Sequence, residues 1–385
     1  MQSRVLPRLP ILSWSAFKGA RHGGVPSLLD AQQLVYTQSG RAAIALALRL
    51  LAVGPGDRVL VPTFHCPTMI APVVAAGAEP VFYALDATGY PSMDHLHSLG
   101  SKPARAMLAA HYFGLPRPMA SLRRFCDLHD MALIEDCAHT FFGSSDGRPV
   151  GSWGDFAIAS LTKFFPVPEG GCLASGSRSL GDQALPRRSI VAELRTAFDA
   201  IEIGSRHEGF PGLNTALRAT FELKTALLTK WRSSDQETQH KDDVPGSARY
   251  LAALNPTQPT RVARWIVQHA SLSSIVSARR RNYLHLIERL SDIPGLQVLH
   301  PTLPEGAVPY VLPLLAERPE ARYHRLRISG VPIFRWDDTW TTMPKVEGDV
   351  GVIWARSLFQ LGCHQDLRLD DLETIARQLR WAFDC

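Results

Sequence analysis

The chain has 385 residues, of which 45% are hydrophobic and 20% are charged, so it is long enough for one large and one smaller folded domain. Its 41 basic and 36 acidic residues give a net charge of +5, which is compatible with an anionic substrate but does not require one. The basic cluster Arg279 to Arg281 fits the polar face of a helix, and we see no basic stripe of the kind that binds nucleic acid.

The six cysteines show no CxxC pair and no Cys/His spacing. This pattern argues against zinc or another metal site and against a disulfide framework, and it predicts reduced thiols. No run approaches the ~18 apolar residues of a membrane span, and the N-terminus lacks the apolar core of a signal peptide. We therefore expect a soluble, cytoplasmic protein with neither a membrane nor a nucleic acid as partner.

Residues 1–34 are rich in Pro, Gly and Ser and are predicted to form an irregular N-terminal arm. After Tyr36, the pair Ser39-Gly40 breaks the chain, and an Ala/Leu run predicts a helix up to Gly54. A glycine turn that opens a helix is an anion site, because free N–H groups and the positive end of the helix dipole face the ligand. Ser39 acting as an ordinary N-cap would explain the same residues.

The next segments predict a βαβ unit of a parallel sheet, with strands at 58–62 and 80–85 around a helix at 69–78. The loop 63–67 lies at the carboxyl end of the first of these strands. A further strand near 106–110 leads into the word HYFGLP, which begins at His111. His111 either lines an active site or is a strand-end histidine whose hydrogen bonds are satisfied by the fold.

The stretch 131–171 combines an acid and a lysine at the ends of two predicted strands. MALIED reads as a buried strand that ends in Asp136, and FAIASL reads as a second strand that delivers Ser160 and Lys163. Pyridoxal phosphate (PLP) chemistry needs such a pair, because a lysine holds the cofactor's aldehyde and a carboxylate keeps its ring nitrogen protonated. Ser160 is placed to contact the phosphate. A capping Asp beside a solvated Lys is the simpler interpretation of these residues alone.

The second half of the chain is less regular at first. Residues 176–244 predict two helices and a polar linker, RSSDQETQHKDD. Beyond them we expect a long helix at 262–290, strands at 308–317 and 332–336, an intervening helix at 321–331, and a closing strand and helix. We therefore divide the chain into an arm (1–34), a large α/β domain (35–244) and a small C-terminal α+β domain (245–385).

Several words taken together resemble the DegT/StrS-type sugar aminotransferases, a family of fold-type-I PLP-dependent enzymes. The matching words are SGRAA, IEDCAH, GRPVGSWGDFA, SLTK and EGGCLAS, and the chain is similar to a divergent member. The resemblance implies an α/β fold with a mostly parallel seven-stranded sheet between helices and a smaller C-terminal domain. It also implies a homodimer with shared active sites.

The resemblance assigns roles to individual positions. Gly40, Arg41 and Ala42 inherit the phosphate cradle, although the family usually carries Thr or Ser where Arg41 stands. His139 falls near the cofactor's phenolic oxygen. The family stacks an aromatic ring on the pyridine at the position of Cys66, so either His65 does the stacking or Cys66 packs against the ring. A buried structural cysteine remains the commoner role.

Substrate contacts are less well matched. The family's Gly-x-Asn-x-Arg word has Asn214 as its nearest counterpart, and Arg335 falls in the substrate-facing C-terminal segment. Arg335 would grip an anionic group or form a surface ion pair. His111 is a third candidate.

The resemblance implies PLP-dependent transamination, in which Lys163 and Asp136 are catalytic. The amino donor would be glutamate, and the acceptor a keto sugar, commonly nucleotide-linked, in polysaccharide or secondary-metabolite biosynthesis. Two alternatives stay open. One is a PLP enzyme of another type, either a lyase or an enzyme with a non-sugar acceptor. The other is a PLP-binding but catalytically idle regulatory or scaffold protein, against which the retention of Asp136 and Lys163 argues.

Overall fold

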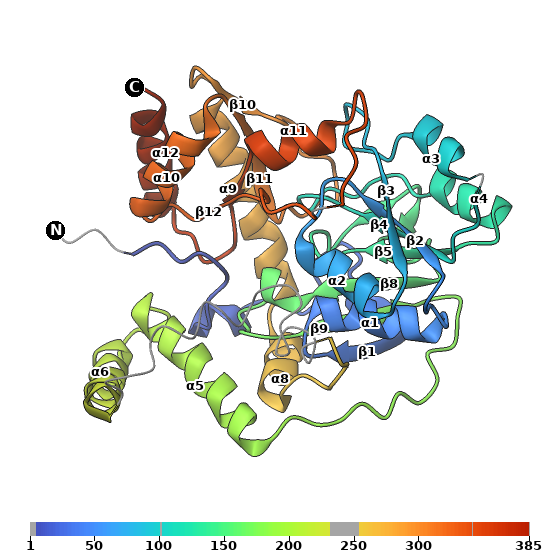
Figure 1. The fold of residues 1–385 in the computed structure, drawn as a ribbon. Helices are drawn as coiled ribbons and strands as arrows, with labels where there is room; N and C mark the ends of the chain where they lie inside the picture. The colour runs from blue at the N-terminus through green and yellow to red at the C-terminus, as the bar shows by residue number, and fades with distance from the viewer. Residues whose placement is uncertain (1–4, 101, 232–253, 341, 385) are drawn as a thin grey trace.

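The computed structural model describes residues 5–100, 102–231, 254–340 and 342–384. Its centre is a seven-stranded sheet in the order β1-β9-β8-β5-β4-β2-β3 (Figure 1). From β8 to β3 neighbouring strands pair in parallel, while β9 runs antiparallel to both of its neighbours. The strands are β1 (Gln33–Thr37), β2 (Arg58–Pro62), β3 (Glu79–Tyr83), β4 (Ala106–Ala110), β5 (Ala132–Asp136), β8 (Phe156–Ser160) and β9 (Gly171–Ser175). The predicted mostly parallel seven-stranded sheet is confirmed.

Four helices connect the strands of this sheet: α1 (Gly40–Leu50), α2 (Pro67–Ala75), α3 (Met93–Leu99) and α4 (Ala120–Leu128). Helix α2 joins the parallel pair β2 and β3, which confirms the predicted βαβ unit. Helix α1 packs on β8 and β9 through a run of small buried residues that includes Ala43 and Ala47. Small side chains let the helix axis approach the sheet closely, which brings its N-terminus to the strand ends. A short hairpin, β6 (Ser144–Ser145) and β7 (Arg148–Pro149), lies between β5 and β8.

A second, antiparallel sheet has the order β10-β11-β13-β12. Its strands are β10 (Leu296–Val298), β11 (Val311–Ala316), β12 (Ile333–Phe334) and β13 (Leu358–Gly362). The helices around it are α9 (Leu272–Leu290), α10 (Pro319–Ile328), α11 (Val350–Ser357) and α12 (Leu369–Phe383) (Figure 1). This arrangement matches the predicted C-terminal α+β pattern, with β12 shorter than the strand expected at 332–336.

The prediction of a single helix at 262–290 is wrong, because the structure has two helices there. Helix α8 (Arg261–His269) ends at Ala270, whose backbone is extended, and α9 begins at once. Ser271 caps α9 by accepting a hydrogen bond from the Ser274 N–H at 3.2 Å, while its own N–H donates to the Ala16 carbonyl of the N-terminal arm. A serine between two amphipathic runs offers the chain a cap in place of a continued helix.

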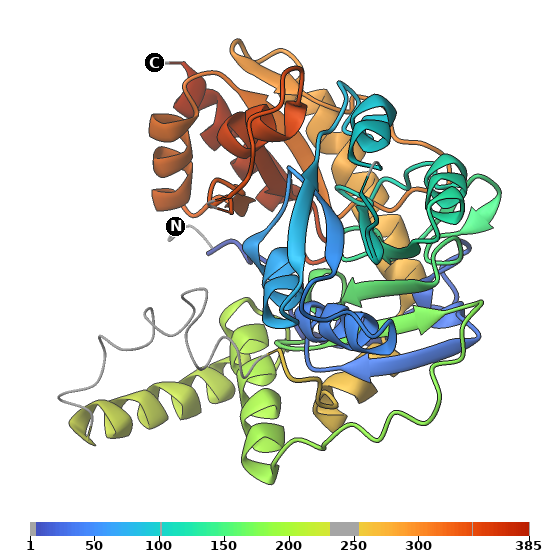
Figure 2. The same ribbon diagram turned by 45° about the vertical axis from the view of Figure 1, so that its right-hand side comes forward.

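Helices α5 (Ile190–Arg206) and α6 (Asn214–Trp231) project away from both sheets (Figures 1 and 2). The N-terminal arm, with the 3-10 helices η1 (Trp14–Phe17) and η2 (Leu28–Asp30), passes the turn that joins them. The Trp14 N–H donates to the Gly209 carbonyl, and the Trp14 ring meets Phe210 edge-on at 5.2 Å. The whole of the predicted polar linker, 232–243, lies outside the described residues.

Two large hydrophobic clusters make up most of the core of the described residues, beside a small contact between Ala71 and Leu254. The larger one surrounds the seven-stranded sheet and also contains residues of α8 and the first turns of α9, such as Ile266 and Ile275. The smaller one fills the space between the C-terminal sheet and its helices. The domain limits at 34 and 244 remain a prediction. Within the described residues, no helix is both long and apolar enough to cross a membrane.

One tight turn joins the two parts of the molecule. Phe113 and Gly114 both have positive φ, 65° and 88°, and the Phe113 carbonyl accepts a hydrogen bond from the Tyr310 N–H at 2.8 Å. A Cβ on Gly114 would collide with the backbone of Val308 to Tyr310. Only glycine therefore lets this turn seat the segment that precedes β11.

We predict that Gly114→Ala lowers the free energy of unfolding by about 3 kcal/mol or more, because it adds a backbone collision to an unfavourable φ. Gly212→Ala is the matched control, since Gly212 has a φ of +87° but nothing within 4 Å of an added Cβ. It should lower the free energy of unfolding by about 1 kcal/mol. Urea unfolding of both variants is the measurement, and equal losses would contradict the role assigned to the turn.

Candidate active site

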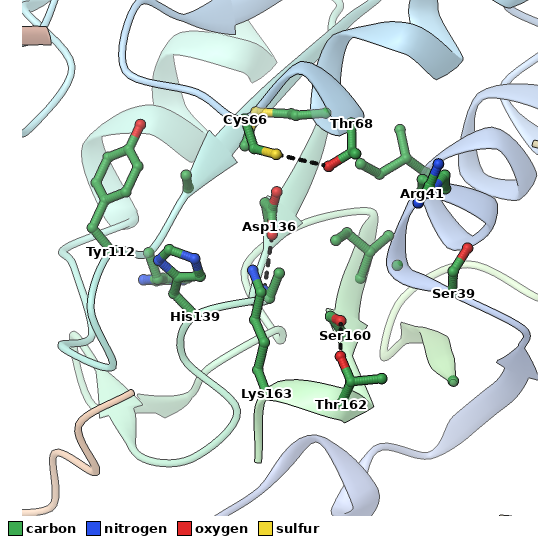
Figure 3. A pocket seen from close by; sticks show the side chains of 18 of the residues that line it. Ser39, Arg41, Cys66, Thr68, Tyr112, Asp136, His139, Ser160, Thr162 and Lys163 are labelled. Carbon is green, nitrogen blue, oxygen red and sulfur yellow. Dashed lines mark hydrogen bonds between the residues drawn. The ribbon is translucent and has the colours of Figure 1, made fainter. Parts of the chain in front are cut away.

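A cavity of about 280 Å³ opens at the carboxyl ends of β4, β5 and β8 (Figure 3). This edge of a parallel sheet is where ligands bind in open α/β folds. The side chains and backbone that line it come from distant segments of the chain, namely Ser39, Gly40, Arg41, Ile44, Cys66, Thr68, Met69, Ala110, His111, Tyr112, Asp136, Ala138, His139, Ile158, Ser160, Thr162, Lys163, Pro168, Glu169, Gly170 and Trp336. Eight of the twelve candidate site residues are among them.

The N-terminus of α1 forms one end of the cavity. Ser39 caps the helix by accepting a hydrogen bond from the Ala42 N–H at 3.3 Å. Ser160 and Thr162 lie across from it, with their hydroxyl oxygens 3.3 Å apart (Figure 3). Gly171 of β9 leaves room for this packing, because a Cβ there would collide with the Ser39 backbone. A helix N-terminus flanked by two hydroxyl groups is suited to a phosphate.

Two of the three residues predicted for the phosphate cradle border this end of the cavity. Gly40 and Arg41 line it, and a Cβ on Gly40 would lie 3.3 Å from the Ser160 Cβ. Ala42 does not line the cavity. Its N–H donates a hydrogen bond to the Ser39 hydroxyl, and its methyl group is buried in the core.

Asp136 and Lys163 enter the cavity from adjacent strands (Figure 3). Asp136 ends β5, and Lys163 ends the 3-10 helix η3 (Leu161–Lys163) that follows β8. Burial raises the pKa of Asp136, and the Lys163 charge, the Ala138 N–H at 2.8 Å and His111 offset part of the rise. Burial lowers the pKa of Lys163, against the opposing effects of Asp136 and Cys66. Each group thus favours the charged form of the other in a site that disfavours both charges.

Backbone contacts fix the position of Lys163. The buried Arg279 of α9 donates from Nη2 to the Lys163 carbonyl at 2.7 Å and from Nη1 to the carbonyls of Pro309 and Tyr310. Burial lowers the pKa of Arg279 to about 10. One guanidinium therefore ties the lysine loop to the segment before β11.

Glu135, the residue before Asp136, holds the opposite side of β5. Its carboxylate accepts hydrogen bonds from the N–H groups of Gly151, Trp153 and Gly154 and lies 3.0 Å from the His111 Nε2. The Nδ1 of His111 accepts the Arg117 N–H at 2.9 Å. His111 borders the cavity, but both of its ring nitrogens are engaged. The ligand atoms of His111, Glu135 and Cys137 lie within 4.8 Å of one another, yet these contacts already saturate the carboxylate.

The loop 63–67 does not bring His65 to the cavity. The His65 Nδ1 lies 3.1 and 3.0 Å from the carbonyls of Pro62 and Thr63, and its Nε2 accepts the Trp340 N–H. Its ring is buried against Phe82. Cys66, by contrast, lines the cavity, where its Sγ accepts a hydrogen bond from the Thr68 hydroxyl at 3.1 Å (Figure 3). Of the two residues considered for the stacking position, Cys66 lines the cavity and His65 does not. A contact between Cys66 and the cofactor ring stays a prediction.

The remaining two candidates also lie outside the cavity lining. Asn214 begins α6, where its side chain accepts the Phe210 N–H at 3.0 Å. Arg335 forms ion pairs with Glu320 and Asp337 at 3.3 and 3.2 Å. Of the two roles expected for it, the structure therefore has the ion pair and not a contact in the cavity. The neighbouring Trp336 lines the cavity instead.

The sequence analysis singled out Arg335 in this segment, whereas the structure places its neighbour Trp336 in the cavity lining. Side chains alternate along an extended segment, so a one-residue uncertainty in register exchanges the two. Thr162 and Glu169 were also missed. Thr162 lies between Ser160 and Lys163 in the sequence, and Glu169 follows Lys163 by a few residues. This closeness along the chain was the signal that could have found them.

His139 lines the cavity beside Lys163 (Figure 3). Its Nδ1 is buried and has no hydrogen-bond partner among the described residues. Burial lowers the pKa of His139 well below its usual value, and the Lys163 charge adds to this effect. The imidazole is therefore uncharged near neutral pH.

The sheet order and the acid–lysine pair at its edge define a fold-type-I PLP-dependent transferase fold. Comparison with known proteins agrees. Residues 25–201 match the model of the DegT/DnrJ/EryC1/StrS aminotransferase family, so this part of the chain is similar to that family.

Three relatives illustrate the similarity. The chain is 27% identical over 292 residues to a dTDP-4-dehydro-2,3,6-trideoxy-D-glucose 4-aminotransferase of Saccharopolyspora spinosa, covering 75% of this chain and 65% of that protein. It is 31% identical over 183 residues to a GDP-perosamine synthase of Vibrio cholerae, covering 46% and 50%. The crystal structure of NtdA from Bacillus subtilis with bound cofactor PMP covers 93% of this chain and 74% of that one at 15% identity, with a TM-score of 0.61. The chain thus spans less than two thirds of the length of these two curated relatives.

We predict that Asp136→Asn raises the free energy of unfolding of the cofactor-free protein at neutral pH, because the buried carboxylate has a raised pKa. The folded-state pKa of Asp136 lies above its unfolded value, so the folded state binds more protons than the unfolded state in the pH range between these two pKa values. The wild-type protein should therefore lose stability relative to the variant as the pH rises through the folded pKa.

Asp155→Asn is the control of opposite sign. Burial raises the pKa of Asp155, but hydrogen bonds from Arg123, the Leu133 N–H and Arg178 outweigh it and leave the pKa lowered. This variant should be less stable than wild type at neutral pH, and the difference should shrink as the pH falls. Urea unfolding at pH 4 and 7 measures both. A loss of stability in Asp136→Asn at pH 7 would contradict the prediction.

Proposed function

We propose that the protein is a PLP-dependent aminotransferase. The observation that carries this proposal is the placement of Asp136 and Lys163, from adjacent strands, in one cavity that also contains the N-terminus of α1. An acid, an amine and an anion site are the three groups that a pyridine ring with an aldehyde and a phosphate requires.

The residues present fit that cofactor. The α1 N-terminus with Ser160 and Thr162 would hold the phosphate, and the guanidinium of Arg41 replaces the hydroxyl usual in the family. Asp136 would face the ring nitrogen. The buried Nδ1 of His139, which has no hydrogen-bond partner among the described residues, supports the proposal, because a bound ligand would supply one.

When bound, PLP supplies an aldehyde for the amino group and an electron-poor ring that stabilises negative charge on the neighbouring carbon. The chain's own residues then manage protons. Asp136, buried beside Lys163, would keep a proton on the ring nitrogen of the bound cofactor by its negative charge. Lys163 takes up and returns a proton at Nζ, and its lowered pKa increases the fraction of neutral amine that acts as a base near pH 7. Burial in the cavity limits competing exchange with water.

The acceptor we propose is a keto sugar, nucleotide-linked, and the donor is glutamate. The two curated relatives support the acceptor, since their names describe a dTDP-sugar aminotransferase and a GDP-perosamine synthase. The resemblance also leads us to propose a cytoplasmic homodimer with shared sites, working in polysaccharide or secondary-metabolite biosynthesis. The assignment of donor and assembly rests on the family alone.

A second candidate is a PLP enzyme with a different acceptor or reaction. The observations that favour it are the thiol of Cys66 in the cavity, where the resemblance places a stacking ring, and the position of Asn214 outside the cavity lining. Both departures from the family pattern concern residues expected to contact the substrate or the ring face, and they leave Asp136 and Lys163 in place.

Borohydride reduction of the PLP-loaded protein should attach the cofactor to Lys163. Peptide mass spectrometry should find the added mass on that residue and on no other lysine. Lys163→Arg should bind no cofactor covalently, whereas Lys102→Arg, at an exposed position, should be labelled as wild type is. An unlabelled Lys163 in protein that holds PLP would refute the assignment.

Glutamate should convert the PLP form to the pyridoxamine form, seen as a loss of visible absorbance and production of 2-oxoglutarate. Asp136→Asn should slow this half-reaction by about a hundredfold or more, because the ring nitrogen loses its charged partner. Failure of every amino donor in PLP-loaded protein would favour the second candidate over transamination.

A further inference from the structure

His139 is surrounded by aromatic rings. Its imidazole lies 4.6 Å from the Tyr310 ring and 4.7 Å from the Trp336 ring, measured between centroids, with interplanar angles of 40° and 41°. Phe113 contacts it at 6.5 Å. No ring contact joins Tyr310 to Trp336 in the described part of the chain, so the two rings approach His139 from different directions.

These two rings come from the C-terminal part of the chain, whereas His139 belongs to the seven-stranded sheet. Tyr310 directly precedes β11, and Trp336 follows β12 by two residues. Tyr310 is seated by its N–H bond to Phe113 and by the bond from Arg279 to its carbonyl. The same two aromatic rings face the lysine, with Nζ 5.4 Å from the Tyr310 centroid and 5.9 Å from the Trp336 centroid.

The charge state of His139 depends on these neighbours. The ionisable groups that face it are the Lys163 amine and the Tyr310 phenol. Burial raises the pKa of Tyr310, so the phenol stays neutral. A positive imidazole would therefore meet a cationic amine in a wall of apolar rings. A neutral imidazole keeps both a donor and an acceptor nitrogen for hydrogen bonding.

We propose that Tyr310 and Trp336 are positioning residues of the cofactor pocket, which hold the His139 imidazole uncharged and in one orientation beside Lys163. The pocket wall is then complete only when the C-terminal sheet is docked on the turn at Gly114. This inference rests on the proposed function for the identity of the ligand, but its effect on His139 does not require any ligand.

The first test is the titration of His139 in the cofactor-free protein, followed by NMR with labelled histidine. The chain has 14 histidines, and His139→Gln identifies the signal by its loss. Wild type should show no titration of His139 between pH 5 and 8. Trp336→Ala should raise the midpoint of its titration by about one pH unit or more, because water then reaches the ring. Trp336→Phe should restore the wild-type behaviour.

Trp340→Phe is the matched control, since Trp340 lies in the same segment and its backbone N–H donates to the His65 Nε2. Within the described residues, its ring makes no contact with the His139 ring. It should leave the titration unchanged. A His139 signal that titrates near pH 6.5 in wild type, or identically in wild type and Trp336→Ala, overturns the proposal. Trp336→Phe keeps the test informative if the alanine variant does not fold.

The second test adds PLP. Trp336→Ala should bind PLP about tenfold more weakly and shift the pH profile of the bound cofactor's absorbance, while Trp340→Phe should match wild type. If the wild-type protein binds no PLP while the NMR result stands, the proposed function fails and the packing inference survives. If PLP binds normally to Trp336→Ala with an unchanged pH profile, the positioning role is refuted while the function stands.

Discussion

The burial of two opposite charges at one sheet edge is the constraint on which the site depends. Asp136 and Lys163 each lose solvation, and each is supported by the other's charge. Neither would remain charged there alone, because an isolated buried charge is lost by a shift in pKa. The surrounding fold is arranged around this pair. Glu135, one residue before Asp136, uses its four hydrogen-bonding contacts to hold the strand end that presents the aspartate.

The lysine and the C-terminal sheet are held by shared contacts. Arg279 bonds the carbonyls of Lys163, Pro309 and Tyr310, and the turn at Phe113 and Gly114 receives the same segment from the other side. A buried guanidinium without a carboxylate is stable here because backbone carbonyls accept its N–H groups. Movement of the C-terminal sheet would therefore disturb the lysine loop and the rings around His139 together.

Periodicity and strand-end chemistry made much of the fold predictable. The strands that end at Asp136 and Ser160 and the helix that begins at Gly40 follow from apolar runs bounded by glycine or acid, and such local signals survive in the folded chain. The prediction of a single helix at 262–290 was wrong because Ser271 caps α9 and its N–H donates to a carbonyl of the distant N-terminal arm. The sequence around Ser271 does not indicate that its N–H will donate to the carbonyl of the distant Ala16.

The sequence by itself determined the acid, the lysine and the glycine turn, since each sits next to the element that positions it. Only the tertiary structure decided which side chains surround them. In the folded chain the His65 ring is buried in the core, and both ring nitrogens of His111 have hydrogen-bond partners. Asn214 and Arg335 make contacts outside the cavity lining, whereas Trp336 lines the cavity. These outcomes depend on side-chain direction and, for His65 and Trp336, on contacts between segments more than a hundred residues apart. Spacing along the chain specifies neither.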